Sequence, residues 1–165
     1  MAEDVHAIRL TAQSLPDAVA DGTNIVARAN MSLASHLAGR AFSSGPFLGL
    51  VHATGHPISA TLGVAHGQTL ATMMPHVMRF NIDAVRDRYA DIAQAMGVAA
   101  DADAAIEAVE QLSATVGTNR TLTELGGTAD HVDGLTLDAL RDVIILSTPR
   151  YPTRDQIAEP YGLAL

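Results

Sequence analysis

The chain has 165 residues, a length that predicts one domain, and it carries a net charge of −8. All of the acidic excess lies in residues 81–165, which hold fourteen acidic residues and six arginines, so no basic patch is available to bind nucleic acid. Because there is no cysteine, disulfides and thiolate chemistry are excluded, and we expect a cytoplasmic location.

Apolar residues recur three and four positions apart along most of the chain, which is typical of amphipathic helices. The first helix is predicted over residues 3–13 and is interrupted by Pro16. The second is predicted to begin at Thr23 or Asn24, both of which are good N-cap residues, and to run for about 20 residues. Its apolar positions are Ile25, Ala29, Leu33 and Leu37.

The segment from Ala41 to Met78 contains no charged residue. Its three prolines, its glycines and its polar interruptions argue against a membrane span and favour a buried part of a soluble protein. Within it we predict one helix that ends near Ala60 and another that begins near His66. Gly63 and Gly67 are the expected breakers between them.

A further helix is predicted from Asn81, as its N-cap, to Gly97, which follows the last turn. The next amphipathic helix is opened by Asp101 and Asp103 and closed by Gly117. Both predictions depend on residues that satisfy the free backbone groups at a helix end.

Residues 123–134 are predicted to form a loop, and a helix is expected to start near Thr136. The last helix is predicted to begin at Thr153, because Thr153 and Gln156 have the spacing of a capping box. No stretch alternates as a strand does, and the glycines form no GxGxxG motif for a dinucleotide. The sequence therefore predicts a single all-α domain over residues 1–165.

Four of the seven histidines lie between Gly49 and Asn81. His52 and His56 are four residues apart, so on a helix they share a face at about 6 Å along the axis. This HxxxH spacing is a known geometry for a pair of metal ligands, although a buried histidine more often makes only a hydrogen bond. Apart from His66, we interpret the remaining four histidines (His6, His36, His76 and His131) as structural. We interpret the methionines of this segment as core residues.

His66 shares an ion with His52 only if the chain reverses between them. Fourteen residues separate the two, which is about 21 Å of rise in one helix. Two nitrogens that bind one ion lie at most about 4.2 Å apart. Pro57, Gly63 and Gly67 offer the reversal. Spacing alone thus nominates His52 with His56, and a reversed chain would allow His52 with His66.

The run "GLVHATGHPISATLGVAHGQTLATMMPHVMRFN" resembles the iron-containing (group III) alcohol dehydrogenases. That family carries G-L-x-H-x-x-x-H-P followed by a later H-G and an ending similar to "PHVMRFN". The flanking "ARANMSLASHLAGRAFSSGPFLGLVHA" and "RYADIAQAMG" resemble its neighbouring helices. The ending "STPRYPTRDQIAEPYGLAL" is similar to its C-terminus, so the resemblance covers nearly the whole chain.

The resemblance implies the helical C-terminal domain of the iron-containing alcohol dehydrogenase and dehydroquinate synthase-like fold. In that family a divalent metal, Fe²⁺ or Zn²⁺, polarises an alcohol or aldehyde oxygen while hydride passes to or from NAD(P). Carried over to this chain, His52 and His66 are metal ligands. His56 becomes a catalytic residue that faces the nicotinamide and substrate and relays a proton.

The chain also departs from the family pattern. It shows no glycine-rich nucleotide-binding domain, and no aspartate in residues 1–48 has a histidine four positions later, as the family's remaining ligand helix would require. We therefore expect the metal-binding portion of an NAD(P)-linked alcohol dehydrogenase that is inactive without a complementing nucleotide-binding chain. The alternative is a stand-alone, non-catalytic oligomerisation or interaction module. In either case we expect self-association through apolar surface of residues 41–78.

Overall fold

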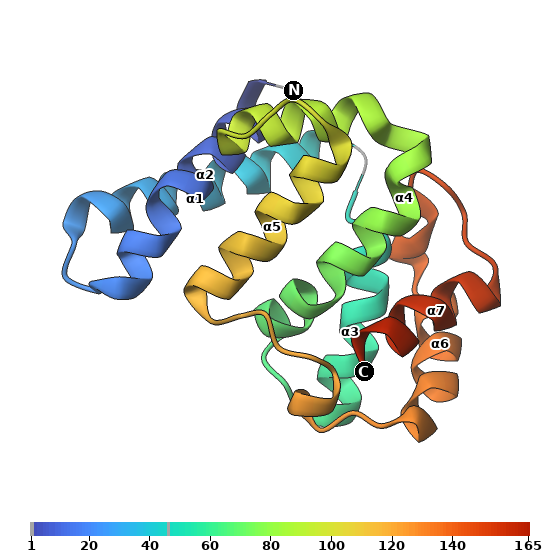
Figure 1. Ribbon diagram of the computed structural model, residues 1–165. Helices are drawn as coiled ribbons and strands as arrows, with labels where there is room; N and C mark the ends of the chain where they lie inside the picture. Colours follow the sequence, from blue (N-terminus) through green and yellow to red (C-terminus); the bar gives the residue numbers. More distant parts are fainter. Residues whose placement is uncertain (1, 46) are drawn as a thin grey trace. The chain divides into compact units, whose positions relative to one another are not determined.

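A computed structural model describes residues 2–45 and 47–165. In these residues the chain forms helices and short 3₁₀ turns but no strand, which confirms the all-α prediction (Figure 1). The α-helices are α1 (Ala2–Ala20), α2 (Ile25–Ser44), α3 (Leu50–Leu62), α4 (His66–Met96), α5 (Ala102–Val116), α6 (Val132–Arg141) and α7 (Arg154–Ala164). The 3₁₀ turns are η1 (Thr123–Leu125), η2 (Ala129–His131) and η3 (Val143–Ser147).

The chain divides into two compact units. The first consists of residues 1–46 and 85–117, and the second of residues 47–84 and 118–165. One boundary falls within α4 at Val85, whose backbone angles (φ −139°, ψ 27°) are not helical. The single domain that we expect over residues 1–165 stays a prediction.

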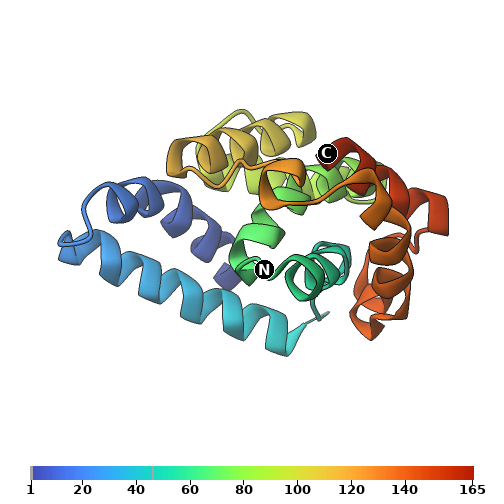
Figure 2. The ribbon, with the colours of Figure 1, turned by 90° about the horizontal axis from the view of Figure 1, so that it is seen from below.

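In the first unit, α1 and α2 lie side by side as a hairpin (Figure 2). Asp21 orders the turn between them, because its Oδ1 accepts hydrogen bonds from the backbone N–H and the hydroxyl of Thr23. Asn24 then caps α2 by accepting from Ala27 N–H, which confirms Asn24 as the N-cap. The expected interruption at Pro16 is wrong. Proline removes one helical hydrogen bond, but packing along α2 keeps α1 continuous to Ala20.

The expected helix start at Asn81 is also wrong, because α4 runs unbroken from His66 through Asn81 and departs from helical geometry only at Val85. Asn81 is buried, and burial of this part of α4 overrides its preference for a cap. The predicted ends are confirmed at Gly97 and Gly117, whose positive φ angles of 86° and 76° suit glycine.

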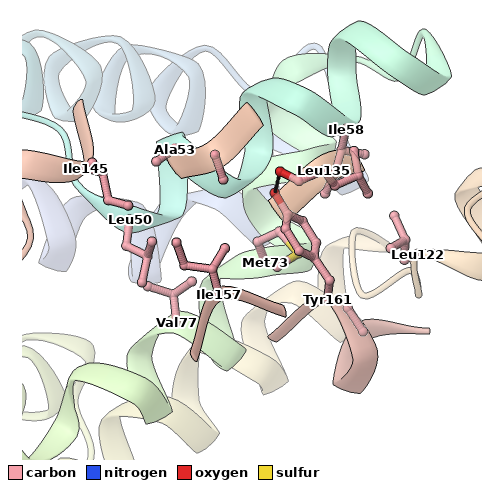
Figure 3. Packing of buried hydrophobic residues seen from close by; sticks show 12 residues of the cluster. Leu50, Ala53, Ile58, Met73, Val77, Leu122, Leu135, Ile145, Ile157 and Tyr161 are labelled. Atoms are coloured by element: carbon pink, nitrogen blue, oxygen red, sulfur yellow. Dashed lines mark hydrogen bonds between the residues drawn. The ribbon is translucent and has the colours of Figure 1, made fainter. Parts of the chain in front are cut away.

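The second unit has its hydrophobic core between α3, α4, α6 and α7 (Figure 3). Tyr161 of α7 lies fully buried at its centre, and its hydroxyl donates to Thr54 O of α3 at 2.8 Å and approaches Leu135 O of α6 at 3.4 Å. The core also holds Leu50, Ala53, Ile58, Met73, Val77, Leu122, Leu135, Ala139, Ile145, Ile157 and Ala164. Met73 is completely buried, in agreement with the core role expected for the methionines.

In the second unit, side-chain capping marks the start of α7. The capping box is confirmed, because Thr153 and Gln156 bond each other's backbone N–H at 3.3 and 3.0 Å. The helix expected near Thr136 instead begins at Val132 and ends at Arg141. The predicted loop therefore contains η1, η2 and the first turn of α6.

Of the helices in the described residues, none is long and apolar enough to cross a membrane.

Candidate functional site

The candidate site is the corner between α3 and α4, within the second unit. His52 and His56 lie on α3, which ends at Leu62, and His66 is the first residue of α4. Gly63 makes the turn with a φ of 68°, and its N–H donates to Ser59 O. The predicted reversal is therefore confirmed, and only three residues separate the two helices. Gly67 is not a breaker, since it belongs to the first turn of α4.

The reversal brings the three histidine rings together. Ring centroids are 5.3 Å apart for His52 and His66, 5.3 Å for His56 and His66, and 5.7 Å for His52 and His56. When two imidazole nitrogens bind one metal ion at about 2.1 Å in tetrahedral geometry, the centres of the two rings lie about 5.2 Å apart. The distance between His52 and His66 is thus compatible with a shared ion.

Small residues allow α3 and α4 to approach closely enough for this convergence. A Cβ atom on Gly55 would lie 2.7 Å from Leu70 Cδ2, so a larger residue where the helices meet would require the Leu70 side chain to shift. The hydroxyls of Ser59 and Thr69 form a hydrogen bond of 3.1 Å between the helices. Thr69 also donates to His66 O at 2.8 Å, which ties the first turn of α4 to the contact. The small residues of this segment therefore position His66 beside α3.

Asp142 is a fourth member of the site that the sequence reasoning missed. It lies between α6 and η3, and its Oδ2 is 2.6 Å from His56 Nδ1. Its other oxygen, Oδ1, accepts a hydrogen bond of 3.0 Å from Ile144 N–H as the N-cap of η3. An aspartate directly before an apolar run is a visible cap signal. Its partner, however, lies 86 residues away and cannot be read from spacing.

Burial and charge favour a neutral His52 imidazole and an ionised Asp142 carboxylate. Desolvation lowers the pKa of His52, the positive charges of His66 and His56 lower it further, and Asp142 opposes them. Burial acts to raise the pKa of Asp142, but hydrogen bonds from Ile144 N–H and His56, with the nearby histidine charges, lower it overall. Neutral imidazole nitrogens are the form that binds metal ions or accepts a proton.

The side chains of the site differ in exposure. The side chain of His56 is 38% exposed and that of Asp142 is 18% exposed, while His66 is exposed at the start of α4. The described residues contain no group of three or more His, Cys, Asp or Glu side chains arranged to hold a metal ion. The site thus offers two predicted ligands and an oriented third histidine, and the assignment of His52 and His66 as ligands stays a prediction.

The other histidines do not join the cluster. His6 and His36 are exposed residues of the first unit. His131 accepts from Thr128 N–H at 3.1 Å and helps to cap η2. His76 lies ten residues beyond His66 on α4 and is half-buried. The interpretation of these four histidines as structural stays a prediction.

Comparison with known proteins identifies the class to which this fold and site belong. The family model described as "Fe-containing alcohol dehydrogenase family, C-terminal" matches residues 2–165. The chain therefore belongs to the Fe-containing alcohol dehydrogenase family and corresponds to its C-terminal, helical part.

Individual relatives agree with this assignment. The probable alcohol dehydrogenase EutG of Salmonella typhimurium is 40% identical over 97% of this chain and 40% of its own length. The NAD-dependent methanol dehydrogenase of Bacillus methanolicus is 36% identical over 94% of this chain and 42% of its own. A crystal structure of 1,3-propanediol oxidoreductase superposes with a TM-score of 0.93 at 37% identity, covering 99% of this chain and 44% of that one. The chain thus spans less than half the length of these relatives.

Proposed function

We propose that the chain is the metal-binding portion of a metal-dependent, NAD(P)-linked alcohol dehydrogenase. The observation that supports this most strongly is the convergence of His52, His56 and His66 in a chain that the family model matches almost end to end. The relatives' names supply the reaction class, dehydrogenation of an alcohol.

His52 and His66 would hold the metal through neutral imidazole nitrogens. Imidazole suits both Fe²⁺ and Zn²⁺, and burial keeps His52 unprotonated, so the donor set fits such an ion. When bound, the ion would polarise the alcohol or aldehyde oxygen. Two ligands leave coordination positions to be filled by water or by groups from a complementing polypeptide.

His56 would handle the proton. Oxidation of an alcohol transfers a hydride to the nicotinamide and releases the hydroxyl proton, which needs an acceptor near the reacting oxygen. Because Nδ1 of His56 faces Asp142, its Nε2 is the nitrogen left for that proton. The ring is partly exposed, so the proton can pass on to solvent.

The pair His52 and His56 remains a competing ligand set. A metal-bound histidine commonly donates its second ring N–H to a carboxylate, and His56 has such a partner in Asp142. Family resemblance favours His66, whereas this contact is compatible with His56 as a ligand. Binding measurements on single variants separate the two.

The test is zinc or cobalt titration of His52→Ala, His56→Ala and His66→Ala, with the exposed His36→Ala as a matched control. A complete zinc site is worth about 10–16 kcal/mol, and half of that gives a dissociation constant between about 1 μM and about 0.2 mM. His52→Ala and His66→Ala should each lose most of the binding, while His56→Ala and His36→Ala should lose little. If His56→Ala abolished zinc binding and His66→Ala retained it, the metal would be assigned to the HxxxH pair of His52 and His56.

The chain by itself should not turn over NAD(P) with short alcohols, diols or their aldehydes, even with added iron or zinc. We propose that the nucleotide is bound by a complementing nucleotide-binding chain or domain in the cytoplasm. Activity assays of the pure 165-residue chain test this, and clear turnover would contradict the proposal that another chain or domain binds the nucleotide.

A stand-alone oligomerisation module is the second candidate. The expectation that residues 41–78 expose an apolar surface stays a prediction. Their buried large apolar side chains are Leu50, Ile58, Met73, Val77 and Met78, whereas Phe42 is 39% exposed and Phe47 is 61% exposed. In the second unit the most exposed large apolar side chains include Val143 (76%) and Leu146 (73%) of η3. Self-association through η3 predicts a dimer or larger species in sedimentation at high micromolar concentration. The variants Val143→Asp and Leu146→Asp should shift it toward monomer, and a strict monomer would count against this function.

A further inference from the structure

We infer that Asp142 is a positioning residue that fixes the proton of neutral His56 on Nδ1, so that Nε2 is the nitrogen that accepts the proton of the alcohol. The catalytic meaning of this inference rests on the proposed function. The tautomer itself is a property of this chain and can be measured without substrate, nucleotide or metal.

The contact between the two side chains determines which atom donates. An ionised carboxylate can only accept hydrogen bonds, so at 2.6 Å from Asp142 Oδ2 the Nδ1 atom of His56 must carry the hydrogen. A bond of this length with an ionised acceptor belongs to the stronger class of protein hydrogen bonds. Neutral imidazole has a single N–H, which leaves the lone pair on Nε2.

Asp142 is itself held in place. Its Oδ1 accepts from Ile144 N–H at 3.0 Å, while Oδ2 faces His56, so each oxygen has a separate partner. The residue joins the end of α6 to η3, and both elements pack against α3. The packing of the second unit thus holds the Asp142 carboxylate beside His56, which lies 86 residues earlier in the chain.

The choice of tautomer matters for proton transfer. Nε2 can accept a proton only in the tautomer with hydrogen on Nδ1, and the partner of Nδ1 sets that tautomer. In a serine protease triad, changing the carboxylate to an amide favours the wrong tautomer and lowers kcat about 10⁴-fold. An amide at position 142 can offer His56 either a carbonyl oxygen or an N–H, so it no longer specifies one tautomer.

The experiment is long-range ¹H–¹⁵N correlation NMR of the histidine rings in the chain, at a pH of about 9 where imidazole is neutral. In the unmodified chain His56 should be almost entirely the tautomer with hydrogen on Nδ1. In Asp142→Asn the ratio of the Nδ1–H tautomer to the Nε2–H tautomer should fall by at least about tenfold, because the charge-assisted bond that holds hydrogen on Nδ1 is lost. Asn remains a good N-cap when its carbonyl oxygen accepts from Ile144 N–H, and this orientation turns the amide N–H toward His56 Nδ1 and favours hydrogen on Nε2.

Asp101→Asn is the matched control. Asp101 is also an N-cap aspartate, accepting from Asp103 and Ala104 N–H, but it belongs to the first unit. This variant should leave the His56 tautomer unchanged. A mixed or Nε2–H tautomer in the unmodified chain would overturn the inference even if Asp142→Asn failed to fold. An equal shift in Asp101→Asn would do the same.

Zinc titration of the same samples separates this inference from the proposed function. If His52→Ala and His66→Ala bind zinc as well as the unmodified chain does, the proposed metal site fails while the tautomer result stands. If zinc binding follows His52 and His66 but the tautomer is not fixed, only the inference fails. A zinc-affinity loss of about 10–100-fold in Asp142→Asn that disappears in a His56→Ala background would also overturn it. Asp142 would then support a metal ligand instead of a base.

Discussion

Replacing Tyr161 with phenylalanine tests whether the buried hydroxyl joins α7 to the helix that carries His52 and His56. Tyr161 has no exposed surface, and its hydroxyl donates to Thr54 O at 2.8 Å and lies 3.4 Å from Leu135 O. The change removes this donor while the ring keeps its place in the core, so it isolates the polar contact.

The magnitude follows from the lost hydrogen bond and the acceptor that is left behind. A typical intramolecular hydrogen bond contributes about 0.5–1.5 kcal/mol, and a buried group without its partner costs about 1–3 kcal/mol. Tyr161→Phe should therefore lower the free energy of unfolding by about 1–2 kcal/mol. For a chain of this length that corresponds to a fall in Tm of about 2–8 °C.

The assay is thermal or urea unfolding followed by circular dichroism, with Tyr151→Phe as the matched control. Tyr151 is 60% exposed, so the same chemical change should alter stability by at most about 0.5 kcal/mol. Equal effects of the two substitutions would refute the reasoning, because they would show that the buried hydroxyl contributes no more than an exposed one.

The same residue predicts the alkaline limit of stability. Burial raises the pKa of Tyr161 above its usual range, and the charge of Asp138 adds to this shift. The folded chain then keeps a proton that the unfolded chain loses. Stability is therefore complete below the ordinary tyrosine pKa of about 10 and declines as the pH rises above it. Tyr161→Phe should weaken this decline in unfolding measured between pH 9 and pH 11, whereas Tyr151→Phe should leave it unchanged.

Two further predictions concern local geometry. Gly127→Ala should destabilise the chain by about 1–3 kcal/mol in urea unfolding, because the added Cβ would overlap the buried Leu122 side chain and lie 2.9 Å from its carbonyl oxygen. Gly134→Ala places its Cβ in open space on α6 and should stabilise the chain by about 0.5–1 kcal/mol. Changes in stability of the same sign for the two variants would contradict this reasoning. The Thr23 hydroxyl and then its N–H lower the pKa of Asp21, so Thr23→Val should raise that pKa in an NMR titration, and an unchanged value would remove the hydroxyl as a cause. The contribution of Asp21 to stability is present above its unfolded pKa and is lost as pH falls through its lower folded pKa.

Features decided by a few neighbouring residues could be predicted from the sequence. Asn24, Asp101 and Thr153 cap their helices because each side chain bonds a backbone N–H two or three residues ahead. Gly63 and Gly117 end helices because both adopt positive φ. Helical periodicity identified the fold class for a similar reason, since it needs only local spacing.

Local signals failed where packing outweighed them. Pro16 and Asn81 both lie inside helices, the first packed along α2 and the second buried. The break in α4 falls instead at Val85, a residue that carries no breaker signal. At Pro16 and Asn81 the free energy of burying a helix face exceeded a preference that acts through one backbone hydrogen bond.

For the site, the sequence by itself determined the helical pair His52 and His56 and, through Gly63, the reversal toward His66. Only the tertiary structure decided that the three rings meet and that Asp142 faces His56. The reason is physical. The caps and turns are short-range hydrogen bonds that a few residues specify, whereas the contact between Asp142 and His56 exists only because α6 and η3 pack on α3 over a common apolar core. That packing depends on side chains spread from Leu50 to Ala164, and no local spacing encodes it.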